Sequence, residues 1–91
     1  MATVKDHFAH KNDAMYCEGV PVRDIVDAVG TPAYVYSLAQ LRDSFQSLDQ
    51  AFAASRHLVC FSVKANSNLA VLRAFVKEGS GFDIVSGGEL F

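Results

Sequence analysis

The 91-residue sequence has only two cysteines and two prolines, and it contains no long hydrophobic run. Cys17 and Cys60 stand far apart, with no CxxC or Cys/His spacing, so the sequence predicts no metal site and indicates free thiols in a reducing compartment. No apolar stretch approaches the roughly 20 residues needed to cross a bilayer, and residues 1–10 have no apolar export signal. We therefore expect a cytoplasmic protein with no membrane association.

An excess of charge of one sign is also missing. The formal net charge is -2, and the charged residues are scattered along the chain. Nucleic acids and anionic membranes attract concentrated positive charge, so neither is an expected partner. With 51% hydrophobic and 20% charged residues, the composition is that of a globular protein. The length allows one small domain at most.

The end of the sequence carries apolar side chains without an evident partner. Leu90 and Phe91 follow a predicted turn, where a new helix would begin. A natural domain seldom ends on the first turn of an element. We therefore expect the chain to be the N-terminal part of a longer protein, and to fold poorly or aggregate when alone.

The first 36 residues predict short elements. Residues 1–19 are weakly patterned, with apolar positions that suit short extended pieces. Pro21 is placed to open an amphipathic helix, and Gly30 is placed to end it in a left-handed conformation. The β-branched and aromatic residues 33–36 then predict a strand.

Ser37 begins the clearest predicted helix. Ser37 and Gln40 have the spacing of a capping box, in which the hydroxyl accepts from the third helical amide and the Gln side chain reaches back. An apolar stripe follows at helical spacing, made of Leu38, Leu41, Phe45, Leu48 and Phe52. This stripe predicts a face that packs on a core.

The remaining residues alternate between strands and helices. The expected elements are a strand at 57–63 covered on both faces, a polar turn at 64–68, a helix to about Lys77 ended by Gly79, a strand at 82–85, a turn at 86–88 and a helix from Glu89. Such alternation predicts a parallel sheet built of βαβ units. An eight-stranded βα barrel needs about 250 residues, so this chain would supply only the opening of one.

Lys64 directly follows the buried-looking strand, at the strand end where barrel enzymes gather reactive side chains. An amine held there loses solvation, which disfavours its charged form, and a neutral amine can attack an aldehyde. Ser62 is expected on the same side as Lys64 and leaves room for a flat ring. Asp83, near the end of the next strand, could reach the same mouth. Each signal alone also has a structural explanation. Lys64 is compatible with an exposed lysine, Ser62 with a small core residue and Asp83 with a turn or capping residue.

Several motifs resemble one known family. Phe61-Ser-Val-Lys64-Ala-Asn-Ser-Asn68 resembles the cofactor-lysine motif of the pyridoxal-phosphate-dependent decarboxylases of ornithine, diaminopimelate and arginine. The family's next strand and turn resemble Gly81-Phe-Asp83-Ile-Val-Ser-Gly-Gly-Glu89-Leu. Upstream, Cys17-Glu-Gly-Val-Pro21 and Gly30-Thr-Pro-Ala-Tyr-Val-Tyr-Ser37 are similar to the diaminopimelate branch. The resemblance runs from about Phe8 to Phe91, with its motifs in the family's order.

The resemblance implies an α/β fold: a pyridoxal-phosphate-binding (β/α)8 barrel beside a β-sandwich domain. Residues 1–36 would contribute to the sandwich, and residues 37–91 would form the first βα units of the barrel. The implied enzyme is a homodimer that decarboxylates a small amino acid, meso-2,6-diaminopimelate, to L-lysine and CO₂. Most of its site would lie beyond residue 91, so this chain alone would be inactive.

The resemblance also implies residue roles. Lys64 would be the catalytic lysine that holds the cofactor, pyridoxal 5'-phosphate. Asp83 would line the cofactor pocket, Glu89 would support that pocket from behind, and Ser62 would form its wall, where the family commonly has alanine. Gly87 and Gly88 are expected to form a tight turn rather than the family's phosphate loop.

Three alternatives remain open. The first is another decarboxylase, of the ornithine or arginine type, or an alanine-racemase-like enzyme on the same barrel. The second is a non-enzymatic pyridoxal-phosphate-binding protein, against which the β-domain-like residues 1–36 argue. The third is an α/β segment in which Lys64 is simply exposed.

Overall fold

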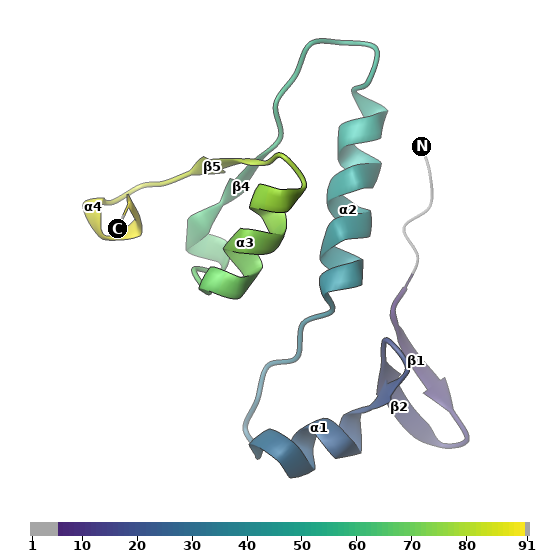
Figure 1. Ribbon diagram of the computed structural model, residues 1–91. Coiled ribbons are helices and arrows are strands. Elements are labelled where there is room, and N and C mark those ends of the chain that lie inside the picture. Colours follow the sequence, from purple (N-terminus) through teal and green to yellow (C-terminus); the bar gives the residue numbers. More distant parts are fainter. Residues whose placement is uncertain (1–5, 91) are drawn as a thin grey trace.

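The computed structural model describes residues 6–90 as two small sheets joined by helices (Figure 1). The N-terminal elements are β1 (Phe8–Lys11), β2 (Ala14–Cys17), β3 (Val20–Pro21) and α1 (Val22–Val29). The elements that follow are α2 (Leu38–Ala51), β4 (Cys60–Ser62), η1 (Val63–Ala65), α3 (Leu69–Lys77), β5 (Gly81–Asp83) and α4 (Gly87–Leu90). In Figure 1 the first group lies at one end, and α2 leads from it toward α3 and the second sheet. Among residues 6–90, no helix is both long and apolar enough to span a bilayer.

The short extended pieces predicted near the N-terminus form a three-stranded antiparallel sheet in the order β1-β2-β3. Two-residue turns connect the strands. Asn12 and Asp13 have φ values of 51° and 62°, and Glu18 and Gly19 have 53° and 83°. Positive φ at both central residues characterises the turns whose twist matches antiparallel strands. The local sequence therefore specifies this sheet through its turns more than through its hydrophobic pattern.

Helix α1 is confirmed, with a small shift at its start. Pro21, which was predicted as the first helical residue, is instead the last residue of β3 and the N-cap of α1, and the helix begins one position later at Val22. Gly30 ends the helix with φ 79°, and its N–H donates to the Val26 carbonyl at 2.7 Å. The left-handed conformation costs glycine little because it has no Cβ.

The strand predicted over residues 33–36 is wrong. These residues belong to no strand, and Tyr34 is 91% exposed. β-branched and aromatic residues suit a strand only where a neighbouring strand takes up the backbone hydrogen bonds. No described element pairs with residues 33–36.

The capping box at Ser37 is half confirmed. The Ser37 hydroxyl accepts a hydrogen bond from the Gln40 N–H at 3.0 Å, as predicted. The Gln40 side chain does not reach back, because its oxygen accepts from the His7 N–H at 3.0 Å. His7 Nε2 also donates to Asp43 at 2.7 Å. Two side chains of α2 therefore hold the segment that leads into β1.

The core lies where α2 and α3 pack on one face of the β4–β5 pair. Phe61 of β4 stacks on Phe75 of α3 with centroids 4.2 Å apart, and Phe45 of α2 meets the same ring edge-on at 6.2 Å. Val71 completes the buried cluster. Strands β4 and β5 are parallel, as the βαβ pattern predicted. They are shorter than predicted, and the expectation of cover on both faces is wrong for the described residues, because Leu58 is 68% exposed and Cys60 is also exposed.

Gly81 permits the close approach of the two parallel strands. A Cβ built on Gly81 would lie 2.8 Å from the Cys60 sulfur and 3.1 Å from Leu58 Cδ2. Cys60 is also the register partner of Gly81. A larger residue at this position would push β5 away from β4, and with it Asp83.

Asparagines begin α3, as predicted. The Asn68 side chain accepts from the Ala70 N–H at 2.9 Å, and Asn66 accepts from the Asn68 N–H at 2.9 Å. Gly79 follows the helix with φ 88°. The tight turn predicted at Gly87 and Gly88 is wrong, because both residues begin α4. The Ser86 hydroxyl accepts from the Glu89 N–H at 3.3 Å, which favours a helical first turn over a reversal.

The exposed apolar surface predicts weak cooperativity for this chain alone. Its radius of gyration is 15.7 Å, whereas a compact chain of this length has about 12 Å. Val29, Leu58, Leu69 and Leu90 are each at least 67% exposed. We expect a shallow thermal transition by circular dichroism and binding of a hydrophobic dye at low temperature. A sharp transition with no dye binding would contradict this expectation.

His57 generates a prediction about pH. Its Nδ1 lies 2.8 Å from the Ser55 carbonyl, and its Nε2 lies 2.7 Å from Asp49 at the end of α2. The pKa of His57 is raised, first by the Ser55 carbonyl and then by Asp49, because both acceptors favour the protonated ring. The stability that protonated His57 gains from the Ser55 carbonyl and Asp49 is therefore fully present below about pH 6.5, the ordinary imidazole pKa. This stability is lost as pH rises through the raised pKa.

We expect NMR titration of His57 to show this raised midpoint, and amide exchange in residues 49–59 to quicken above it. Asp49→Asn should lower the midpoint while retaining the contact with Ser55. A midpoint at or below the value of an unstructured histidine would show that the two acceptors do not act on this ring.

Candidate functional site

Lys64 lies at the carboxyl end of the parallel strand pair. Strand β4 ends at Ser62, and the next three residues form the single turn η1. Val63 in this turn is 4% exposed and anchors it, and its carbonyl accepts from the Asn66 N–H at 3.1 Å. Lys64 itself is exposed. A buried valine thus holds a tight turn that carries the lysine at the edge of the sheet.

The structure brings Ser62 and Asp83 together. They are register partners in the parallel pair, and each is the last residue of its strand. Paired residues of neighbouring strands project to the same face, so the hydroxyl and the carboxylate belong to one side of the sheet. Strand alternation predicted that Lys64 lies on the same side as Ser62. This argument does not apply, because β4 ends at Ser62 and Lys64 lies in η1. The turn η1 determines the direction of Lys64 instead.

Three polar side chains at this edge lack partners within residues 6–90. The Ser62 hydroxyl oxygen is buried without a hydrogen bond. Lys64 and Asp83 are exposed, and neither has an ion pair or a hydrogen bond to another described side chain. Neighbouring polar residues such as Asn66 and Ser80 are engaged within the chain. The edge therefore carries an exposed amine, an exposed carboxylate and a buried hydroxyl, none of which has a side-chain partner among residues 6–90.

The expectation that Lys64 loses solvation is wrong for the described residues. Desolvation requires other groups to cover the amine, and α2 and α3 pack around Phe75 instead of over the carboxyl edge. Residues 6–90 place Lys64 at the end of the strand pair and leave its side chain uncovered.

Glu89 is placed in a different environment. One carboxylate oxygen accepts from the Ser86 hydroxyl at 3.1 Å, and the other is buried with no partner among the described residues. Glu89 borders an apolar hollow of about 330 Å³ together with Val63 and Leu72. Glu89 therefore borders the same hollow as Val63, the residue that precedes Lys64 in η1.

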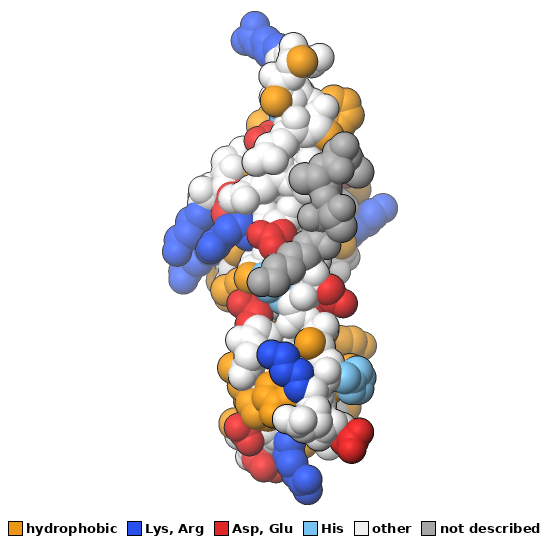
Figure 2. Space-filling view, turned by 90° about the vertical axis from the view of Figure 1, so that its right-hand side faces the viewer, with side chains coloured by type: hydrophobic (Ala, Val, Ile, Leu, Met, Phe, Trp, Pro, Cys, Tyr) orange, Lys and Arg blue, Asp and Glu red, His pale blue; other side chains and the backbone are white. Residues whose placement is uncertain are grey.

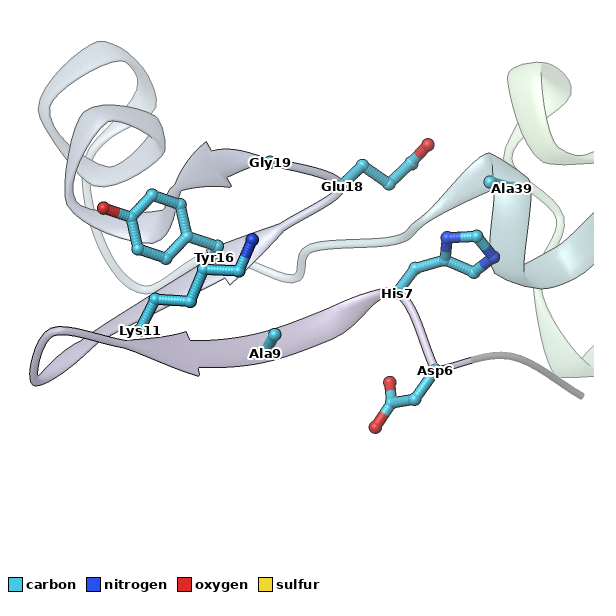
Figure 3. Close-up of a pocket in the computed structure, with 8 residues that line it drawn as sticks. All are labelled: Asp6, His7, Ala9, Lys11, Tyr16, Glu18, Gly19 and Ala39. Carbon is cyan, nitrogen blue, oxygen red and sulfur yellow. The ribbon is translucent and has the colours of Figure 1, made fainter.

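A second hollow, of about 420 Å³, lies over the N-terminal sheet and not at Lys64 (Figure 3). Its charged side chains include Asp6, Lys11 and Glu18, and Lys11 lies beside the Tyr16 ring at 6.0 Å from its centroid. No sequence signal marked this hollow, because the two tight turns assemble it from residues that show no motif. On the face shown in Figure 2, charges of both signs are scattered and form no extended patch of one sign.

Comparisons with known proteins agree on one family. Residues 38–91 match the family model described as pyridoxal-dependent decarboxylase, pyridoxal binding domain. Diaminopimelate decarboxylase of Neisseria meningitidis serogroup B is 53% identical over 76 residues, covering 84% of this chain and 18% of that protein. The Haemophilus influenzae diaminopimelate decarboxylase is 48% identical over 83 residues, covering 91% and 20%.

Solved structures show the same likeness. A diaminopimelate decarboxylase of M. jannaschii in complex with L-lysine matches with a TM-score of 0.88 at 33% identity, over 93% of this chain and 21% of that chain. The structure of AQ1208 from Aquifex aeolicus matches with a TM-score of 0.85 at 36% identity, over 92% and 21%. This chain thus spans about a fifth of the length of these relatives.

Proposed function

This chain belongs to the pyridoxal-dependent decarboxylase family, and on that premise we propose that it carries the cofactor lysine of a diaminopimelate decarboxylase. The proposed reaction converts meso-2,6-diaminopimelate to L-lysine and CO₂, with pyridoxal 5'-phosphate as cofactor. The observation that carries the proposal is that residues 38–91, which include Lys64, match the family's pyridoxal-binding domain. The high identity to enzymes that bear this name supports the choice of substrate.

The residues at the sheet edge fit such a cofactor. Lys64 has an exposed amine with no partner among residues 6–90, and it can bond covalently to an aldehyde carbon once deprotonated. When bound, pyridoxal phosphate supplies the electron sink that decarboxylation of an amino acid requires. Lys64 would hold the cofactor at the carboxyl end of the strand pair, where a position directly after a strand would limit the motion of the amine.

The neighbouring side chains take supporting roles in this proposal. The Asp83 carboxylate lines the pocket, where it can accept hydrogen bonds and favour a nearby positive charge. Ser62 forms the pocket wall beside its register partner Asp83. Glu89 supports the turn from behind, since it shares the apolar hollow with Val63.

The proposal extends to the organisation of the enzyme. Residues 1–36 would contribute to a β-sandwich domain, and residues 37–91 would begin the barrel. The antiparallel sheet of β1, β2 and β3 and the parallel pair of β4 and β5 support this division. The enzyme would act on a small amino acid as a homodimer in the cytoplasm.

The substrate is tested by assay of the full-length product of the gene. With pyridoxal phosphate present, we expect release of CO₂ and L-lysine from meso-2,6-diaminopimelate, measured by chromatography. Activity should be much lower on L-ornithine and L-arginine, because a polar site rejects a substrate that leaves its groups unpaired. Turnover of either of these without production of lysine would overturn the proposed substrate.

The cofactor lysine is tested by borohydride reduction of the same protein after loading with pyridoxal phosphate. We expect peptide mapping to place the pyridoxyl group on Lys64, and Lys64→Arg to abolish both the label and activity. Lys77 is the matched control, because it is an exposed lysine at the end of α3. A label that persists in Lys64→Arg, or that moves with Lys77→Arg, would show that Lys64 is not the anchor.

A further inference from the structure

The Ser62 hydroxyl is an unusual polar group in this chain. Its oxygen is buried and has no hydrogen-bond partner among residues 6–90. An unpaired buried hydroxyl is unfavourable, because it has given up its hydrogen bonds to water. Folding therefore leaves Ser62 able to donate to, or accept from, a group that the described residues do not contain.

Other serines of the chain find partners nearby. The Ser80 hydroxyl donates to the Gly81 carbonyl at 2.6 Å, and the Ser37 hydroxyl accepts from the Gln40 N–H at 3.0 Å. Ser86 pairs with Glu89 on both its donor and acceptor sides. The unpaired hydroxyl of Ser62 is thus a local feature of the end of β4.

The position of Ser62 indicates which group could pair with it. Ser62 is the register partner of Asp83 and stands two residues before Lys64. Ser62 and Ala65, which flank Lys64 in the sequence, both border a hollow of about 320 Å³ that is otherwise lined mainly by apolar side chains such as Leu41 and Phe45. No side chain that lines this hollow pairs with the Ser62 hydroxyl.

We propose that the Ser62 hydroxyl donates a hydrogen bond to the pyridoxal group held at Lys64, and so sets the affinity and the spectrum of that group. This inference rests on the proposed function. A serine has one O–H to donate, so it pairs with one acceptor atom of the ligand. Such a donor stabilises electron density on the acceptor, and this shifts both the absorption maximum and the pH at which the bound chromophore changes its protonation.

The test uses the full-length product with Ser62→Ala, Ser62→Thr and Ser55→Ala. Ser62→Ala should weaken pyridoxal phosphate binding by about tenfold, the equivalent of one hydrogen bond in a buried site, and should shift the absorption maximum and its pH dependence. Ser62→Thr keeps the hydroxyl and should restore most of both. Ser55 is an exposed serine in the segment between α2 and β4, outside the motif around Lys64, and serves as the control, with no expected change.

The outcomes separate this inference from the proposed function. Unchanged affinity and spectrum in Ser62→Ala, while borohydride still labels Lys64, would overturn the role of Ser62 and leave the cofactor lysine in place. Absence of a label on Lys64 in the unmodified protein would instead overturn the proposed function. If Ser62→Ala fails to fold by circular dichroism, Ser62→Cys preserves the side-chain size with a much weaker donor, and wild-type affinity and spectrum in that variant would refute the inference.

Discussion

The contact between Phe61 and Phe75 is the interaction on which the second half of this chain depends. The stacked rings join β4 to α3, and Phe45 brings α2 to the same point. In a core of this size, the burial of aromatic rings supplies most of the hydrophobic contribution to folding stability. With β4 held on this side, its carboxyl end is left open, and the turn that carries Lys64 projects from a supported strand.

The approach of β5 to β4 adds a second constraint, since it brings the candidate residues together. Gly81 leaves room for the Cys60 side chain, and the resulting register pairs Ser62 with Asp83. Ser62 and Asp83 are far apart in the sequence and become neighbours only through the pairing of β4 with β5. Parallel pairing brings the two strand ends together as one polar edge. Replacing Gly81 by a larger residue would shift β5 and so disturb this edge, although Gly81 is not part of it.

The N-terminal sheet is joined to the rest through polar contacts. His7 donates to Gln40 from its backbone and to Asp43 from its ring, and both acceptors lie on α2. Helix α2 packs its apolar side at the β4–β5 pair, and its polar side holds the segment that leads into β1. The proposed division between residues 1–36 and residues 37–91 falls at Ser37, the N-cap of this helix.

The sequence alone determined the local features: the caps at Ser37 and Asn68, the left-handed ends at Gly30 and Gly79, and the order of strands and helices. These depend on hydrogen bonds and dihedral preferences among residues close in the chain. The register that pairs Ser62 with Asp83, the exposure of Lys64 and the failure of residues 33–36 to form a strand were decided by the tertiary structure. Each depends on which distant element lies alongside, and the pattern of a single segment does not contain that information.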